Sequence, residues 1–371
     1  MGRLIIRVIY QLMAGMSYPA RIDSGIAVRD GHGRNAKYRS PRRHVVVALA
    51  WCLALPFPAL AHVPPPRPAK VDPIQIIRAV MEIPDDKIDF ARAKLTFDKL
   101  YDPKTDIDGG VRKVDAMAQT IRTMAGPSAP SRLRLIMLRK YIYERGAWND
   151  NNPYQYDLTD PLGHKPVNRL LSSYLATHRG NCVSMPILFV ALAQRLGLNA
   201  TLSTAPNHVF VKYMDDVTGK TINLETTSGA YPTRDIWIRK NMPMTDRAIA
   251  NGIYMKTLSK KEALVVLAGI VMEREFADER YQEAWDIAEL LRSYHPNDLA
   301  VLLTPANAAM ALTEEEYLSK YPTKADIPPD RLDRLAFLER SVSNGLNHAY
   351  ALGWRETDGE ETPAVPAKAS R

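Results

Sequence analysis

Apolar residues recur at helical spacing in the stretch that runs from Asp72 to about Ala147. Two stripes repeat every three or four positions, the pattern of a helix with one buried face. The first consists of Val111, Val114, Ala118, Ile121 and Ala125, and the second of Leu133, Ile136, Met137, Tyr141 and Ile142. Gly126-Pro127-Ser128-Ala129-Pro130 lies between them and contains residues that end helices. The pattern predicts a helical N-terminal part.

The middle of the chain combines helices with short strands. A polar loop at 149–166 precedes a helix from Asn168 to Leu175, and a second helix follows Cys182 and stops at Gly197. Beyond Leu198 the apolar period changes to that of strands, with β-branched runs bounded by turn residues. The expected strands are Ala200–Thr204, Val209–Tyr213 and Thr221–Glu225, the last two joined by a hairpin loop at 215–220. We therefore predict an α+β fold with a helix-rich core and a small antiparallel sheet.

The last third returns to helical periodicity. Helices are expected from Ala263 to Glu275, from Tyr281 to Tyr294, from Leu299 to Leu312 and from Arg331 to Leu346, with an insertion at 313–329. A helix pair whose second member opens Tyr-x-x-Ala, followed by a Pro-Asn-Asp exit, resembles one tetratricopeptide repeat. Two such units bury too little apolar surface to be stable alone, so we expect them to pack on the core. The polar tail after Gly353 is predicted to be disordered.

The N-terminal region resembles an export signal. Arg42 and Arg43 precede an apolar run of 17 residues, Val45–Ala61, which ends in an A-x-A cleavage motif. Cleavage after Ala61 predicts a periplasmic or secreted protein, and the alternative is a membrane anchor formed by residues 45–61. Two prolines inside the run disfavour a stable span. Because the segment before the signal is long for its class, a later methionine such as Met16 is an alternative start.

Charge argues against nucleic acid as a partner. The 371-residue chain has a net charge of +8, but residues 1–61 carry nine basic and two acidic residues, whereas the remainder carries 40 and 39. The exported chain is therefore close to neutral, and we expect no nucleic acid binding. Contact with a membrane is expected only through an uncleaved signal segment.

Cys182 is the candidate nucleophile. It is the only cysteine after residue 61, and a helical pattern begins directly after it. Unpaired backbone N–H groups and the dipole at a helix N-terminus favour the thiolate form, which is the nucleophile. A lone thiol is also a liability in an oxidising compartment, which makes a purely structural cysteine less attractive there.

His208 and Glu225 supply the base and the acid that such a nucleophile needs. If the hairpin is centred near Val217, position 208 pairs with about 226, so Glu225 should lie beside His208 at the same end of the sheet. Asp215 and Asp216 are poorer partners because they lie near the hairpin tip, about 23–26 Å of strand away. A base within reach of the thiol and a carboxylate to orient the base are the requirements of nucleophilic catalysis.

Each of these residues also has an ordinary structural interpretation. Cys182 could be a small buried apolar residue, His208 a structural residue at a strand end, and Glu225 a cap for the following turn. Cys182, His208 and Glu225 could supply three metal ligands, but no spacing typical of a metal site accompanies them. The sequence contains no P-loop, Rossmann glycine pattern or Gly-x-Ser-x-Gly elbow, and we predict no metal and no cofactor.

The same residues carry a family resemblance. Gly180-Asn181-Cys182 before an apolar helix, the strand motif at 207–211 and the motif at 223–226 resemble the transglutaminase-like superfamily of papain-type folds. The likeness covers about residues 72–350, and is greatest to a bacterial group whose core is followed by tetratricopeptide-like helices. It implies that Cys182 is the nucleophile, His208 the general base and acid, and Glu225 the orienting carboxylate. Many members have Asp at this third position.

The oxyanion donors are predicted from the position of the thiol. The backbone N–H of Cys182 is the natural first donor because it lies at a helix start. A second donor would come from a side chain upstream, with Asn181 and Tyr174 as the candidates.

These observations predict an exported cysteine-nucleophile enzyme that forms a thioester from an amide, with hydrolysis favoured over transamidation. Its substrate would be a protein or peptide. The alternative is a non-catalytic transglutaminase-like scaffold that binds a partner protein through its C-terminal helices. The expected domains are an N-terminal extension with the signal at 1–61, a Pro-rich linker at 62–71, a core at 72–246, a helical region at 247–352 and a tail at 353–371.

Overall fold

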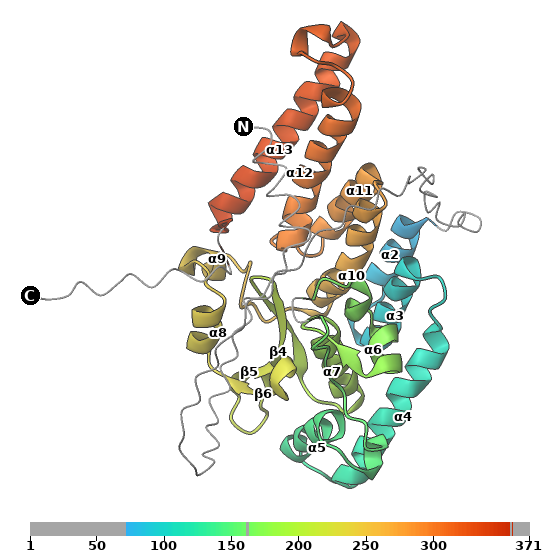
Figure 1. The fold of residues 1–371 in the computed structure, drawn as a ribbon. Coiled ribbons are helices and arrows are strands. Elements are labelled where there is room, and N and C mark those ends of the chain that lie inside the picture. The colour runs from blue at the N-terminus through green and yellow to red at the C-terminus, as the bar shows by residue number, and fades with distance from the viewer. Residues whose placement is uncertain (1–71, 161–162, 357, 359–371) are drawn as a thin grey trace, which may run out of the picture. The chain divides into compact units, whose positions relative to one another are not determined.

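Four helices lead from the start of the described chain towards its middle (Figure 1). A computed structural model describes residues 72–160, 163–356 and 358. The helices are α2 (Pro73–Met81), α3 (Phe90–Tyr101), α4 (Ile107–Ala125) and α5 (Ser131–Tyr143). Aspartates 72, 89 and 106 begin the first three, since each side chain accepts a hydrogen bond from a backbone N–H in the first turn.

The predicted break between the third and fourth of these helices is confirmed. Gly126 follows α4 with a φ of 90°, a conformation that L side chains rarely adopt, and α5 starts at Ser131. The stripe on α4 is buried from Val111 to Ile121. The stripe predicted for α5 is wrong at Ile136, which is 50% exposed, because Leu138 occupies the buried face instead.

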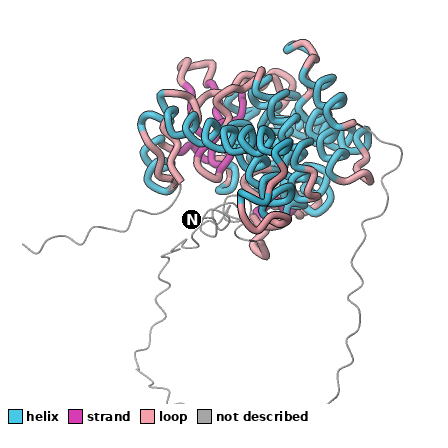
Figure 2. Tube along the Cα trace, turned by 90° about the horizontal axis from the view of Figure 1, so that it is seen from above, coloured by secondary structure: helices cyan, strands magenta, loops and turns pink. Residues whose placement is uncertain are grey.

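The sheet has four antiparallel strands in the order β3-β4-β5-β6, which gather in one place and are flanked by helices (Figure 2). They are β3 (Ala200–Ala205), β4 (His208–Met214), β5 (Thr221–Glu225) and β6 (Tyr231–Thr233). The first three and the hairpin loop match the prediction, and β6 was not predicted. Val211 pairs with Leu224, so the register differs by one residue from the expected one. The predicted α+β class is confirmed.

A second, two-stranded sheet was also not predicted. β1 (Gln155–Tyr156) lies in the polar loop and pairs in parallel with β2 (Arg179–Gly180), which opposes Tyr156 to Gly180. The 3-10 helix η2 (Ala147–Asn149) precedes β1, and the 3-10 helix η3 (Pro166–Arg169) and α6 (Leu171–Thr177) lie between β1 and β2. Strands of two residues are too short to show an apolar period.

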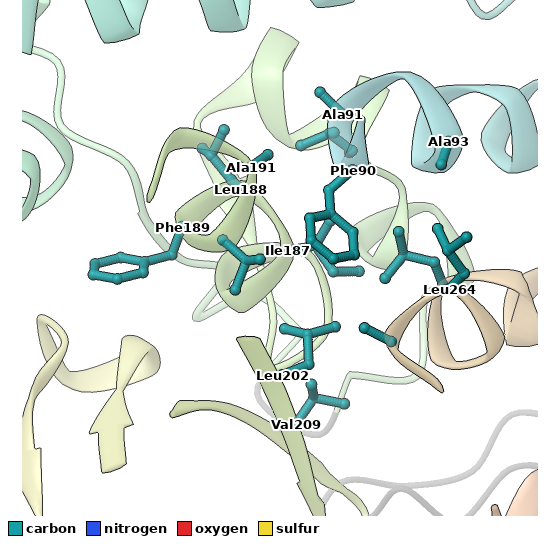
Figure 3. Close-up of a cluster of buried hydrophobic side chains, with 14 of the residues drawn as sticks. Phe90, Ala91, Ala93, Ile187, Leu188, Phe189, Ala191, Leu202, Val209 and Leu264 are labelled. Carbon is teal, nitrogen blue, oxygen red and sulfur yellow. The ribbon is translucent and has the colours of Figure 1, made fainter. Parts of the chain in front are cut away.

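Helix α7 (Ser184–Arg195) lies at the centre of the core. Its residues from Ser184 to Ala193 are all buried, and Gly197 ends it as predicted, with a φ of 65°. Figure 3 shows Ile187 and Leu188 of this helix close to Phe90 of α3, with Leu202 and Leu264 nearby. A helix that is apolar on all sides is stable only when other elements surround it. The helix that follows Cys182 is thus held by α3, α4 and the sheet.

The C-terminal part is helical, as expected. Its elements are α8 (Asp235–Asn241), α9 (Asp246–Ala250), α10 (Lys260–Ala277), α11 (Tyr281–Arg292), α12 (Leu299–Thr313) and α13 (Leu332–Leu352). The insertion contains a π-helical turn, η5 (Glu314–Leu318), and two 3-10 turns, η6 (Lys324–Asp326) and η7 (Pro329–Arg331). The likeness to tetratricopeptide repeats remains a prediction.

Helix α10 joins this part to the core. It contacts α2, α3 and β3, and its residues Leu264, Leu267 and Ile270 belong to the same apolar cluster as α7. The described residues from Asp72 onward form one compact unit. The expectation that the C-terminal helices pack on the core is therefore confirmed.

Several sequence predictions fall on parts of the chain outside this description. The export signal, including residues 45–61, and the Pro-rich linker lie outside the described residues. None of the helices in the described part is long and apolar enough to cross a membrane. Of the predicted tail, Trp354 is buried in a small cluster with Ala248 and Tyr254, so ordered packing extends at least to that residue.

Candidate functional site

Cys182 lies in the turn between β2 and α7. It precedes the first helical residue, Ser184, by two positions. The side-chain oxygen of Asn181 accepts hydrogen bonds from the N–H groups of Val183, at 2.9 Å, and Ser184, at 3.3 Å. The Ser184 hydroxyl donates to the carbonyl of Asn168 at 2.7 Å. These bonds fix the turn that presents the thiol.

Two N–H groups at the start of α7 are already hydrogen-bonded, contrary to the prediction. The prediction assumed unpaired N–H groups at the start of the helix, but Asn181 already accepts from two of them. A helix N-terminus whose donors are capped offers less stabilisation to a nearby anion.

Gly180 is required by close packing beside the thiol. A Cβ on this residue would lie 2.4 Å from the Ser184 hydroxyl and 2.6 Å from the ring of Tyr174. Both distances are far below van der Waals contact, so no larger residue fits here without a shift of the turn. The glycine in the Gly-Asn-Cys motif thus has a packing role.

His208 and Glu225 meet as the hairpin predicts. The Nε2 atom of His208 lies 2.7 Å from Oε2 of Glu225, and both side chains are buried. His208 is the first residue of β4 and Glu225 the last residue of β5, which brings them to the same end of the sheet. The register shift of one residue does not separate them, because the glutamate side chain is long enough to reach the ring.

The imidazole also interacts with the thiol of Cys182. Burial lowers the pKa of His208, but the charge of Glu225 and a side-chain hydrogen bond with Cys182 outweigh burial and raise the pKa to about 10. For Glu225, burial raises the pKa, while His208 and hydrogen bonds from Thr227 outweigh it and lower the pKa. The favoured state at neutral pH is an imidazolium facing a carboxylate.

The structure thus brings Cys182, His208 and Glu225 together. The Nε2 atom of His208 faces Glu225, and the same imidazole interacts with the thiol of Cys182. Among residues 72–160, 163–356 and 358, no three His, Cys, Asp or Glu side chains are grouped to hold a metal ion.

The rejected acidic partners lie elsewhere. Asp215 accepts two hydrogen bonds from the guanidinium of Arg132, at 2.8 and 3.1 Å, and Asp216 accepts one from Ser131. Both aspartates fasten the hairpin loop to the start of α5. Their role is structural, and Glu225 is the carboxylate that reaches His208.

The oxyanion candidates remain predictions. Asn181 uses its oxygen to cap α7, and its amide nitrogen lies close to Gly163, 3.5 Å from where a Cβ on that glycine would be. Tyr174 packs edge-on against Tyr154, and within the described part of the chain its buried hydroxyl has no hydrogen-bond partner. The backbone N–H of Cys182 is the candidate that needs no side-chain movement.

Two residues beside the three were missed from the sequence. Tyr156 lies close enough to Cys182 for the two to interact electrostatically, and burial, followed by this interaction, raises the pKa of the tyrosine. Thr227 donates two hydrogen bonds to Glu225. Tyr156 lies on a strand too short to predict. The contact with Thr227 could have been found from the sequence, because a cap for the following turn was one predicted role of Glu225.

Access to the thiol is narrow. Cys182 is 5% exposed, and its sulfur lies 3.8 Å from the backbone carbonyl oxygen of Asn207. A hollow of about 330 Å³ lies elsewhere, lined by residues that include Arg122, Pro127 and Gly197. It lies at the other end of α7, about 18 Å from the thiol for a helix of 12 residues.

Part of the chain matches a known family. Residues 110–239 match the model of the transglutaminase-like superfamily. The match begins in α4 and ends in α8, and it includes Cys182, His208 and Glu225. The C-terminal helices lie outside it. No curated protein matches the chain.

Proposed function

We propose that this chain is a cysteine-nucleophile acyl-transfer enzyme. The observation that carries the proposal is the buried hydrogen bond between His208 and Glu225, with Cys182 bound to the same imidazole. A charged pair buried behind a thiol costs desolvation energy, which a purely structural cysteine does not require. The transglutaminase-like domain at residues 110–239 supports the same chemistry.

The proposed reaction starts with the proton of Cys182 on His208. The thiolate attacks an amide carbonyl carbon and forms a tetrahedral intermediate with a negative oxygen. The imidazolium of His208 then donates its proton to the leaving nitrogen as the carbon–nitrogen bond breaks, which leaves a thioester on Cys182 and releases an amine. A water molecule next attacks the thioester, and neutral His208 accepts its proton. The carbon–sulfur bond then breaks, which releases a carboxylic acid and restores the thiolate of Cys182 beside the imidazolium of His208.

Glu225 stabilises the charged imidazole through both steps and fixes the orientation of the ring. The backbone N–H of Cys182 and the amide of Asn181 are the proposed oxyanion donors. An amine in place of water would give transamidation. We favour hydrolysis, because water is abundant in an exported compartment.

The substrate and location belong to the same proposal. We propose a protein or peptide as the acyl donor, and export to the periplasm or the exterior, based on the basic pair before the apolar run at 45–61. The C-terminal helices would extend the substrate-binding surface or bind a partner protein.

One observation favours a second function, that of a non-catalytic scaffold. The thiol is only 5% exposed, and a buried cysteine can serve as a small apolar residue. In this alternative the core has kept its arrangement of residues and binds a partner protein through the C-terminal helices. The scaffold needs no reactive thiol, which separates the two functions experimentally.

Alkylation of Cys182 tests the proposal. We would measure the rate of labelling by a fluorescent iodoacetamide from pH 6 to 9, and identify the labelled peptide to exclude Cys52. An enzyme should label rapidly at neutral pH, and His208→Ala should slow labelling. A rate that rises only with the ionisation of an ordinary thiol, in both proteins alike, would favour the scaffold.

A further inference from the structure

Thr227 makes two hydrogen bonds to the carboxylate that faces His208. Its backbone N–H donates to Oε1 of Glu225 at 3.0 Å, and its hydroxyl donates to the same oxygen at 2.6 Å. The other carboxylate oxygen, Oε2, faces His208. Each oxygen of Glu225 therefore has its own partner, and Thr227 holds the one that points away from the imidazole.

The local backbone explains this arrangement. Glu225 ends β5 and caps the short helix η4 (Thr226–Ser228), so its side chain folds back over the turn. The Glu225 carbonyl accepts a hydrogen bond from Ala230 at 2.7 Å, which closes the turn below the carboxylate. The turn continues through Gly229, whose φ of 80° favours glycine. Thr227 is thus held beside Glu225 by the chain itself.

A glutamate needs such support more than an aspartate would. Its side chain has one more rotatable bond, and each free rotation lowers the fraction of time in which Oε2 faces the ring. Hydrogen bonds to a charged group are stronger than those between neutral groups. Two of them on Oε1 leave Glu225 few conformations other than the one that reaches His208.

We propose that Thr227 is a positioning residue for the acyl-transfer reaction. Its hydroxyl fixes the carboxylate of Glu225, which in turn fixes the imidazole of His208 against the thiol of Cys182. This inference rests on the proposed function. In this arrangement Oε1 of Glu225 caps the turn, and Oε2 supports His208.

The neighbouring threonine provides a matched control. Thr226 is fully buried, whereas Thr227 is only partly buried, and in the described part of the chain the hydroxyl of Thr226 has no hydrogen-bond partner. Valine has nearly the shape of threonine without the hydroxyl. Thr226→Val should therefore remove a hydroxyl at the same turn without loosening Glu225.

The test compares Thr227→Val, Thr227→Ser and Thr226→Val with the wild-type chain. Two quantities are measured: the rate of Cys182 alkylation as a function of pH, and the pKa of His208 from the NMR titration of its ring proton. Thr227→Val should slow alkylation at neutral pH by about tenfold and lower the pKa of His208 by about one unit. Thr227→Ser keeps the hydroxyl, so its alkylation rate and its pKa of His208 should lie close to the wild-type values. Thr226→Val should change neither the alkylation rate nor the pKa of His208. Thr227→Ala replaces the valine variant if that variant does not fold.

The two readouts separate this inference from the proposed function. Equal values in Thr227→Val and the wild type, or equal losses in Thr226→Val and Thr227→Val, would overturn the role of Thr227. Equal rates of Cys182 alkylation in the wild type and in His208→Ala would overturn the proposed function instead. In that case the NMR titration still decides whether Thr227 supports the pair formed by Glu225 and His208.

Discussion

The imidazole of His208 and the carboxylate of Glu225 are 17 residues apart in the chain and meet at 2.7 Å, with both side chains buried. The pair lies at one end of the β4–β5 hairpin, next to the turn that carries Cys182. A glutamate at this position raises the question of whether the longer side chain can do what an aspartate does. In the structure, Oε2 reaches the ring while Thr227 holds Oε1.

Replacement of Glu225 should reduce the reactivity of Cys182. Glu225→Gln keeps the size of the side chain but removes the charge that raises the pKa of His208, so that pKa should fall. We expect acyl transfer to fall by about 100-fold. Glu225→Asp should reduce the rate of acyl transfer by less than Glu225→Gln does. The shorter side chain keeps the charge but cannot keep both Thr227 and His208 as partners.

Asp215→Asn is the matched control for this prediction. Asp215 belongs to the same hairpin but pairs with Arg132. Its replacement should lower the stability of the hairpin and leave the alkylation rate of Cys182 unchanged. A similar loss of reactivity in both variants would mean that the hairpin as a whole, and not the carboxylate of Glu225, supports the thiol.

Stability should depend on pH through His208. The pKa of the folded state, about 10, exceeds the ordinary value of 6.5, so between these values the folded protein keeps a proton that the unfolded chain has lost. The stabilisation is therefore fully present below about pH 6.5 and is lost as the pH rises to about 10. Glu225 acts in the opposite sense, because its lowered pKa adds stability that is lost as the pH falls.

Urea unfolding from pH 6 to 10 measures this effect. The wild-type midpoint should decrease more steeply with pH than that of His208→Gln, which cannot bind the proton. Parallel curves for the two proteins would show that His208 is not charged in the folded state.

Gly180→Ala should destabilise the turn that carries the thiol. The added Cβ would collide with Ser184 and Tyr174, which we expect to cost about 1–3 kcal/mol of unfolding free energy. Gly269→Ala is the control, because Gly269 lies inside α10 with nothing within 4 Å of an added Cβ. That substitution should stabilise the protein by about 0.5–1 kcal/mol. Thermal or urea unfolding measures the stability of both variants. Equal changes in unfolding free energy in Gly180→Ala and Gly269→Ala would argue against tight packing at Gly180.

Removal of the C-terminal helices should disrupt the core. A chain that ends near Asp246 lacks Leu264, Leu267 and Ile270, which pack in the cluster that contains α7. Their removal would expose apolar side chains of the core that they now cover. Each large apolar side chain that becomes fully exposed lowers the unfolding free energy by about 1.5–3 kcal/mol. We expect this shortened protein to be insoluble or inactive, as judged by expression and alkylation.

Limited proteolysis of the intact protein provides the independent check. Lys260 and Lys261 bind backbone carbonyls near the end of α2, so the segment around Ser259 is tied to the core. Cleavage there should be slow. Rapid cutting at that point, with release of a stable and reactive N-terminal fragment, would show that the two parts are independent.

Much of the fold could be predicted because its signals are local. Asp72 and Asp106 mark helix starts, Gly126 and Gly197 mark helix ends, and the hairpin between Val209 and Glu225 follows from alternation and turn residues. Local signals fail where contacts decide the outcome. Ile136 has the correct spacing for a buried face, yet it is exposed because neighbouring elements cover Leu138 instead.

The site was predictable to a similar extent. His208 and Glu225 could be paired from the hairpin geometry, even though the register was wrong by one residue. The proximity of Tyr156 to Cys182 depends on the short pairing of β1 with β2. That pairing joins segments more than 20 residues apart and leaves no periodic pattern in the sequence.

The most direct test of the central claim is the trapping of an acyl group on Cys182. The folded protein would be incubated with p-nitrophenyl acetate, with release of p-nitrophenolate followed by absorbance and acetylation followed by intact mass and peptide mapping. We predict a burst of about one equivalent, acetyl on Cys182, and turnover that is lost in Cys182→Ser and strongly reduced in His208→Ala. Absence of acetylation in the folded protein, or equal acetylation of Cys182 with and without His208, would contradict the account.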